Sequence, residues 1–132
     1  WGIIPAGIVT KAVVEVMSFR DAMYYIMTGE TFTGREAAEM KLVNKAVPAA
    51  ELKDKTRELA RTLMGKNPYV LRQAKTAARF VKDLTWDQAG DYLMAKSDQT
   101  EFRDPENGRN TGMKQFLDDK SFKPGLETYD RG

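Results

Sequence analysis

Apolar residues recur at helical spacing along most of the chain. From residue 7 to residue 17 they follow the i, i+3, i+4, i+7 pattern of a helix with one apolar face: Val9, Ala12, Val13, Val16 and Met17. Similar stripes predict helices over about residues 18–29, 33–40, 49–64, 67–82 and 85–102. The chain is therefore predicted to be mostly helical.

Start and stop signals support these helices. Three pairs have the spacing of a capping box: Ser18 with Asp21, Thr33 with Glu36, and Thr85 with Gln88. Asn67-Pro68 supplies a cap followed by a proline at the first helical position, and Asp104-Pro105 repeats this arrangement. Gly108 and Gly112 weaken the helix expected after Asp104, because glycine has a low helix propensity.

One short strand is predicted, from Leu42 to Val47, where β-branched residues precede Pro48. Residues 120–132 contain Pro124-Gly125 and are predicted to form a tail. The expected fold class is a mainly α-helical chain with one short strand.

Composition narrows the possible chemistry. The 132 residues include no cysteine and no histidine, which excludes disulfides, thiolate nucleophiles, Ser-His chemistry and most zinc sites. The net charge of +2 is too small to indicate a nucleic-acid partner, and no apolar run is long enough to span a membrane. We expect no metal, and any acid–base chemistry would use carboxylates, lysines or tyrosines. A start at Trp1 gives no signal-peptide pattern and indicates a piece of a longer protein.

Two groups of polar residues have competing interpretations. Glu36 and Glu39 share a helix face and could form a paired-carboxylate site, although a solvated surface explains them better. Tyr24 and Tyr25 are expected to lie between core and interface, and contact with a ligand is the alternative.

The segment from Gly2 to Gly7 is an apolar loop of small residues that leads into a helix. Small residues let a ligand approach the backbone, and a helix start offers unpaired N–H groups. Many connecting loops share this composition, so the residues alone predict only a helical domain with a ligand loop near its N-terminus.

Several motifs together resemble the C-terminal half of the crotonase (enoyl-CoA hydratase/isomerase) superfamily. The family's helix–turn–strand pattern is matched by Met27-Thr28-Gly29, by residues 37–43 and by Ala46-Val47-Pro48. Residues 24–29, 84–88 and 112–121 most resemble its hydroxycinnamoyl-CoA hydratase-lyase branch. The resemblance runs from Trp1 to about Gly125 and implies the C-terminal portion of the α/β crotonase (ClpP-like spiral) fold.

The resemblance implies a role in hydrating and then cleaving a 4-hydroxycinnamoyl-CoA thioester. It places the acid–base glutamate and the oxyanion-hole loops upstream of Trp1, so no catalytic residue is expected in this chain, which alone should be inactive. The expected substrate-binding residues are those of the opening loop: Trp1, Gly2, Ile3, Pro5 and Ala6. Phe116 and Lys120 are expected to contact CoA in a neighbouring subunit, although a packing role for them is the stronger alternative.

Two positions outside the opening loop depart from the family pattern. Met94 stands where the branch is expected to have a phenol-binding tyrosine, and methionine cannot donate that hydrogen bond. Tyr92 is two residues away, on another side of the helix, so it is not expected to substitute. Lys41 replaces a glycine before Leu42-Val43, which would cost about 1 kcal/mol if that backbone is left-handed.

The resemblance also implies a division of the chain and a set of partners. Residues 1–48 would end the crotonase core, and residues 49–132 would form a helical oligomerisation region. The expected partners are an acyl-CoA thioester and further copies of the chain, as a trimer or hexamer, in the cytoplasm. No cofactor is expected, because CoA is part of the substrate. Two alternatives remain: a non-catalytic helical module that self-associates or binds acyl-CoA, and half of a generic enoyl-CoA hydratase or isomerase.

Overall fold

A computed structural model describes residues 2–123, 125 and 128–131, and these fall into two compact units. Unit 1 covers Trp1–Thr56 and unit 2 covers Arg57–Gly132. The boundary lies inside helix α4 (Leu52–Met64), eight residues after the predicted division at residue 48. The functional roles assigned to the two predicted segments remain predictions.

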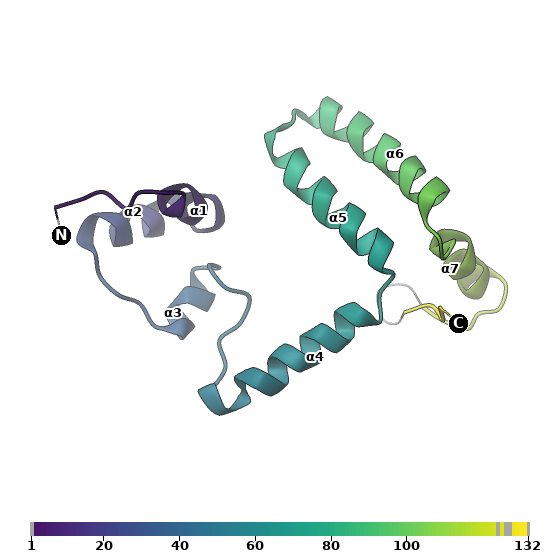
Figure 1. The fold of residues 1–132 in the computed structure, drawn as a ribbon, viewed down its shortest axis with the longest axis horizontal. Coiled ribbons are helices and arrows are strands. Elements are labelled where there is room, and N and C mark those ends of the chain that lie inside the picture. The colour runs from purple at the N-terminus through teal and green to yellow at the C-terminus, as the bar shows by residue number, and fades with distance from the viewer. Residues whose placement is uncertain (1, 124, 126–127, 132) are drawn as a thin grey trace. The chain divides into compact units, whose positions relative to one another are not determined.

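Unit 1 consists of short helices and loops (Figure 1). Its elements are α1 (Val9–Val16), α2 (Phe19–Thr28), α3 (Gly34–Glu39), the short 3-10 helix Ala49–Glu51 and the first part of α4. Helices α1 and α2 pack together, and Met17 and Ala22 are buried there. The apolar stripe predicted from residue 7 to residue 17 thus forms a helix that begins at Val9.

The predicted caps of α2 and α3 are confirmed. The Ser18 hydroxyl accepts a hydrogen bond from the backbone N–H of Asp21 at 3.1 Å. Thr33 and Glu36 form a complete capping box, in which each side chain accepts from the other residue's backbone N–H. Gly29 ends α2 in the left-handed conformation with φ of 70°, which glycine adopts at no steric cost.

The strand predicted from Leu42 to Val47 is wrong: within the described part of unit 1 this segment is irregular. The backbone N–H groups of Leu42 and Val43 both donate to the carbonyl oxygen of Ala37, so they close the end of α3. A strand needs a hydrogen-bonded neighbouring strand. Here the N–H groups of Leu42 and Val43 are already bonded within the turn that ends α3.

Lys41 has a φ of 65°. This is the left-handed backbone conformation in which lysine is expected to be less stable than the glycine of the family pattern. We expect Lys41→Gly to stabilise the full-length protein by about 0.5–1 kcal/mol, because glycine reaches this conformation without a clash between Cβ and backbone. Urea unfolding measures the change. Lys45→Gly, at an exposed residue that is not among the positive-φ positions, is the control and should not stabilise. Equal effects of the two variants would contradict the explanation.

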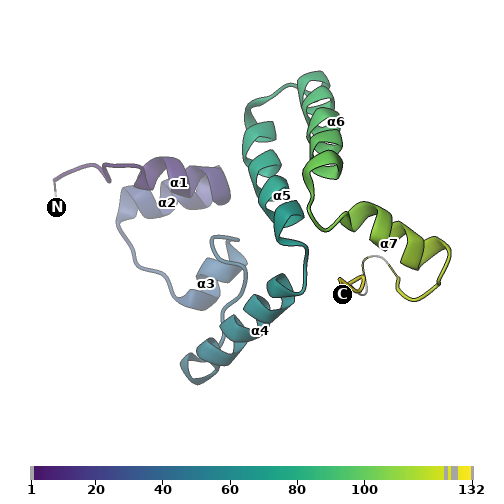
Figure 2. The ribbon, with the colours of Figure 1, turned by 45° about the vertical axis from the view of Figure 1, so that its right-hand side comes forward.

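Unit 2 contains α5 (Pro68–Phe80), the 3-10 helix Val81–Asp83, α6 (Trp86–Arg103) and α7 (Gly108–Leu117). Helices α5 and α6 lie side by side and run in opposite directions, joined by a short turn (Figures 1 and 2). Asn67 caps α5 and Thr85 with Gln88 forms a capping box on α6, as the sequence predicted. The Phe80 and Tyr92 rings stack across the pair with centroids 5.9 Å apart.

Helix α7 begins later than Asp104-Pro105 suggested. Its N-cap is Asn107, which has a left-handed φ of 47° and no side-chain cap bond. Instead, the Asp104 carboxylate accepts from the backbone N–H groups of Glu106 at 3.1 Å and Gly108 at 2.8 Å. Asp104 therefore caps the turn between α6 and α7, and the helix itself starts at Gly108.

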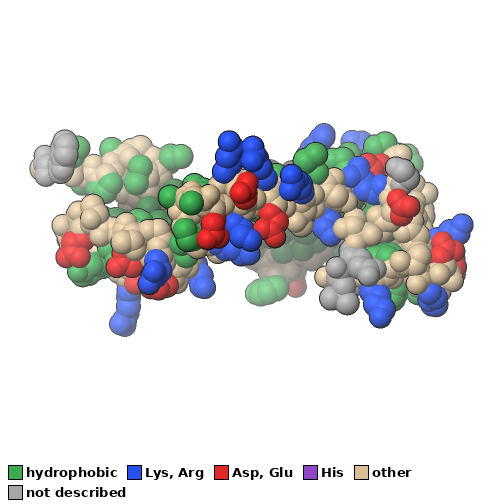
Figure 3. Space-filling model, turned by 90° about the horizontal axis from the view of Figure 1, so that it is seen from below, with side chains coloured by type: hydrophobic (Ala, Val, Ile, Leu, Met, Phe, Trp, Pro, Cys, Tyr) green, Lys and Arg blue, Asp and Glu red, His purple; other side chains and the backbone are tan. Residues whose placement is uncertain are grey.

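The apolar faces of both units are largely exposed. Among the described residues the buried apolar side chains are Met17, Ala22, Ala37 and Ala77. Trp86 and Phe102 of α6 are 94% and 89% exposed, and Figure 3 shows apolar side chains on the visible face. The described residues alone therefore form only a small apolar core. Their helices include none with both the length and the hydropathy needed to cross a membrane.

Candidate functional site

The opening loop of unit 1 holds four of the five predicted substrate-binding residues: Gly2, Ile3, Pro5 and Ala6. All four are exposed, and Ile3 is 79% exposed. Trp1, the fifth, lies outside the described residues. Gly2 and Gly7 have φ values of 70° and 71°, and a Cβ on either would meet open space. The left-handed backbone therefore requires glycine at these two positions, and the surface of the loop is accessible to a ligand.

A hydrogen bond from the Thr10 hydroxyl to the Pro5 carbonyl oxygen, at 2.8 Å, ties the loop to α1. Helix α1 begins without a side-chain cap, because its N-cap residue Ile8 has no side-chain acceptor, and its first turn has no acidic residue. The loop therefore leads to a helix start whose positive dipole end is not neutralised by an acidic side chain.

The tyrosine pair of α2 is tied to its own unit. The Tyr24 hydroxyl donates to the Glu30 carboxylate at 2.9 Å, and this hydrogen bond raises the pKa of Tyr24. The Tyr25 ring packs edge-on against Tyr24 and Phe32 with centroids 5.2 Å and 4.9 Å away. The pair therefore holds the segment after α2 against the helix.

Glu36 is occupied by the start of α3. Its carboxylate accepts from the Thr33 N–H at 2.6 Å and the Thr33 hydroxyl at 2.8 Å. The backbone hydrogen bond, followed by the hydroxyl bond, lowers the pKa of Glu36. Glu36 is therefore a capping residue, and Glu39 lies exposed on the same short helix. The capping geometry supports the surface interpretation over a paired-carboxylate site.

The predicted CoA contacts, Phe116 and Lys120, lie in unit 2 at and just beyond the end of α7. Phe116 is partly exposed and packs edge-on against Phe122 with centroids 6.4 Å apart. Lys120 has a left-handed φ of 52°. Phe116 thus has a local packing role, and the contact of both residues with CoA stays a prediction.

Met94 is 66% exposed on α6. Tyr92 stacks on Phe80, and the Lys96 ammonium lies 5.9 Å from the centre of the Tyr92 ring. These contacts occupy Tyr92 in the packing of α5 against α6. The phenol-binding position expected from the resemblance therefore holds an exposed methionine.

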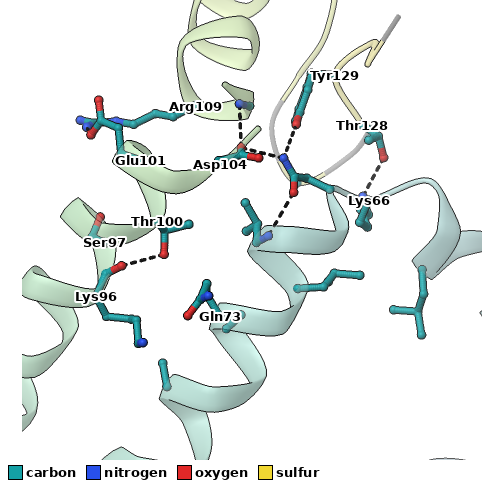
Figure 4. Close-up of a pocket in the computed structure, with 18 of the residues that line it drawn as sticks. Lys66, Gln73, Lys96, Ser97, Thr100, Glu101, Asp104, Arg109, Thr128 and Tyr129 are labelled. Atoms are coloured by element: carbon teal, nitrogen blue, oxygen red, sulfur yellow. Dashed lines mark hydrogen bonds and ion pairs between the residues drawn. The ribbon is translucent and has the colours of Figure 1, made fainter. Parts of the chain in front are cut away.

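Unit 2 contains a cavity of about 760 Å³ that the sequence did not predict (Figure 4). We call it the α5–α6 cavity. Its wall comes from the end of α4, the turn before α5, α5, α6, the start of α7 and the C-terminal segment, and includes Val70, Leu71 and Ala74 from the predicted stripe of α5. The polar side chains labelled in Figure 4 include Lys66, Lys96 and Arg109. The apolar stripe of α5 could be predicted from the sequence, but the other walls include residues that lie up to about sixty positions away in the sequence.

One polar cluster closes an end of this cavity. Asn67 is 4% exposed, and its side-chain oxygen accepts from the N–H groups of Tyr69 and Val70 at the start of α5. Its Nδ2 donates to Asp104 at 2.7 Å and to the Tyr129 hydroxyl at 3.2 Å. The cluster therefore joins the starts of α5 and α7 and the C-terminal segment. Its sequence signal was the pair of caps, Asn67 and Asp104.

The pKa of Asp104 results from opposing effects. Burial raises the pKa of Asp104. Hydrogen bonds from Asn67 and from the N–H groups of Gly108 and Glu106, together with the charge of Arg131, lower it by more than burial raises it, so the net pKa lies below the ordinary 3.8. Among the described residues no cluster of three or more acidic side chains could hold a metal ion. The cluster of Asn67, Asp104 and Tyr129 therefore favours the ionised form of a single carboxylate, that of Asp104.

This shift predicts a dependence of stability on pH. A lowered pKa in the folded state stabilises it above the ordinary carboxyl value, and the stabilisation is lost as pH falls through the lowered value. Below pH 3.8 we therefore expect the free energy of unfolding to fall more steeply for the full-length wild type than for Asp104→Asn. Urea unfolding at a series of pH values measures this. Asp98→Asn, at an exposed position of α6, should keep the wild-type slope; a wild-type slope in Asp104→Asn would contradict the account.

Comparison with known proteins decides the family. The sequence profile described as Enoyl-CoA hydratase/isomerase matches residues 1–124. The chain belongs to the enoyl-CoA hydratase/isomerase family. A solved structure from Mycobacterium abscessus, described as an enoyl-CoA hydratase/isomerase, matches with a TM-score of 0.75 and 26% identity over 88% of this chain and 46% of that one. The expected class, the C-terminal portion of the crotonase fold, is confirmed except for its strand.

Two curated relatives refine the comparison. The chain is 56% identical to a hydroxycinnamoyl-CoA hydratase-lyase from Pseudomonas fluorescens over 99% of its own length and 48% of the relative's. It is 33% identical to a carnitinyl-CoA dehydratase from Salmonella arizonae over 54% of its length and 28% of the relative's. The chain thus spans at most about half the length of these curated relatives.

Proposed function

We propose that this chain is the C-terminal portion of a hydroxycinnamoyl-CoA hydratase-lyase. The observation that carries the proposal is the 56% identity to the Pseudomonas fluorescens relative over almost the whole chain. The substrate class is a 4-hydroxycinnamoyl-CoA thioester such as feruloyl-CoA. The products are an aromatic aldehyde, vanillin for feruloyl-CoA, and acetyl-CoA.

The proposed reaction has two steps. Water adds across the side-chain double bond and gives a β-hydroxy thioester. The β-hydroxyl then loses its proton, the bond between the α and β carbons breaks, and its electron pair forms the enolate of acetyl-CoA, which is protonated. Backbone N–H groups aimed at the thioester oxygen can stabilise the enolate charge, and a carboxyl group with a pKa near the working pH can move the protons. No cofactor is required beyond the CoA of the substrate.

In this proposal the chain supplies surface and contributes no acid or base. The loop formed by Gly2, Ile3, Pro5 and Ala6 lines the acyl pocket, together with Trp1. Its exposure and its two left-handed glycines support this role, because they leave an open apolar surface next to a helix start. The catalytic glutamate and the oxyanion loops belong to the part of the relatives that this chain does not cover.

The exposed apolar faces support a second part of the proposal, which is assembly. Side chains such as Trp86 and Phe102 would be covered by the rest of the fold and by neighbouring subunits in a cytoplasmic trimer or hexamer. Burying an aromatic side chain of this size contributes about 1.5–3 kcal/mol, so exposed faces of this kind favour association. Phe116 and Lys120 would then reach the CoA of a neighbouring subunit.

A second candidate, a generic enoyl-CoA hydratase or isomerase, is favoured by Met94, which cannot donate a hydrogen bond to a substrate phenol. Comparison of kcat/KM for feruloyl-CoA and crotonyl-CoA with the full-length protein separates the two. The hydratase-lyase proposal predicts a clear preference for feruloyl-CoA. A preference for crotonyl-CoA would overturn it in favour of the generic enzyme.

A further inference from the structure

The C-terminal segment Thr128–Arg131 is held by side chains from several parts of unit 2. The Lys66 ammonium donates to the Thr128 hydroxyl at 2.8 Å. The Gln115 side chain bonds the Asp130 backbone twice: its Nε2 donates to the carbonyl at 2.9 Å, and its Oε1 accepts from the N–H at 2.8 Å. The segment is therefore attached both before α5 and on α7, at sites far apart in the sequence.

Arg131 makes the most extensive of these attachments. Its Nη1 donates to the carbonyl oxygens of Met64, the last residue of α4, and of Lys66, each at 3.1 Å. Its Nε donates to Glu106 at 2.8 Å, and its Nη2 makes a second bond to the same carboxylate. A guanidinium suits this site because its five donors lie in one plane and can bond a carboxylate and two carbonyls together. The Glu106 hydrogen bond raises the pKa of Arg131, so the charge is retained.

Tyr129 fits against two glycines of α7. A Cβ on Gly108 would lie 2.3 Å from the Tyr129 hydroxyl, and one on Gly112 would lie 3.4 Å from its ring. Gly108 and Gly112 are both buried. These glycines weaken α7 as an isolated helix, and the space they leave is filled by the tyrosine.

The segment lies beyond the stretch that the family profile matches, which ends at residue 124. The alignment with the Pseudomonas fluorescens hydratase-lyase spans 99% of the chain and so reaches it. Thr128 and Tyr129 also form part of the wall of the α5–α6 cavity. The segment thus lies beyond the matched stretch, and two of its residues lie on the cavity wall.

We propose that Thr128–Arg131 is a clamp that ties α7 to the end of α4 and the start of α5, and so fixes one wall of the α5–α6 cavity. The segments it joins are far apart in the sequence, and the hydrogen bonds of Gln115, Tyr129 and Arg131 connect them directly. The proposal is independent of which thioester the protein uses.

Hydrogen exchange of the full-length protein, followed by mass spectrometry, tests the clamp. We expect Arg131→Ala to speed exchange of the α7 amides about tenfold, because it releases the bonds to Glu106 and to both carbonyls. Exchange in α2 of unit 1 should not change. Arg72→Ala removes an exposed arginine from α5 and is the matched control, with wild-type exchange in α7.

A second variant keeps the test decisive if Arg131→Ala does not fold. Tyr129→Phe removes one hydroxyl, keeps the ring against Gly112, and should speed α7 exchange about threefold through loss of the Asn67 bond. Protection of α7 equal to that of Arg72→Ala, in whichever of these variants folds, would overturn the clamp. Substrate turnover does not enter this readout, so its outcome is separate from that of the proposed function.

Discussion

Replacing Gly108 with alanine is expected to destabilise the full-length protein by about 2–3 kcal/mol, as overpacking of a closed site does. The added Cβ would lie 2.3 Å from the Tyr129 hydroxyl, 2.8 Å from Asn67 Nδ2 and 3.0 Å from an Asp104 oxygen. Asn67 Nδ2 donates hydrogen bonds to both oxygens, so none of these atoms can move away without breaking a hydrogen bond of the cluster. Urea unfolding measures the loss.

Gly90→Ala is the matched control. Gly90 lies inside α6, and a Cβ there would have no neighbour within 4 Å. Alanine is favoured over glycine in a helix by about 0.5–1 kcal/mol, so this variant should stabilise the protein. The same substitution is thus expected to lower the free energy of unfolding at residue 108 and to raise it at residue 90. A Gly108→Ala protein as stable as wild type would show that the cluster is not closed as described.

The second large effect concerns substrate choice. We expect Met94→Tyr to raise the preference for 4-coumaroyl-CoA over cinnamoyl-CoA about tenfold, because a tyrosine hydroxyl can hydrogen-bond the substrate phenol. The family resemblance places the phenol-binding tyrosine at this position of α6. The ratio of kcat/KM for the two thioesters, measured with the full-length protein, gives the change.

Met94→Phe separates the hydroxyl from the ring. It adds an aromatic ring of the same size as that of tyrosine without the donor, and should leave the preference close to that of wild type. An equal gain in both variants would assign the effect to packing. No gain in either variant would contradict the placement of residue 94 beside the phenol.

The helices were predictable because their signals are local. Ser18, Thr33, Asn67 and Thr85 each cap a helix through a backbone N–H two or three residues ahead. Such contacts depend on the nearby sequence alone, so a capping residue followed by an apolar stripe predicts them. The left-handed backbone at Lys41 could be anticipated only through the glycine expected from the family.

The features that sequence did not reveal depend on distant residues. The Asn67–Tyr129 hydrogen bond joins positions 62 apart, and the walls of the α5–α6 cavity come from segments between the end of α4 and the C-terminal segment. The strand from Leu42 to Val47 failed for a related reason, because its apolar pattern has no pairing partner among the described residues. The start of α7 shifted because the Asp104 carboxylate bonds Gly108, four residues ahead.

The most direct test of the proposed function is the product balance from feruloyl-CoA. The full-length protein should release vanillin and acetyl-CoA in equal amounts, because cleavage of one carbon–carbon bond produces one of each. Quantitative chromatography of both products over the reaction measures this. Accumulation of the β-hydroxy thioester without aldehyde would contradict the account, since it would show a hydratase that lacks the lyase step.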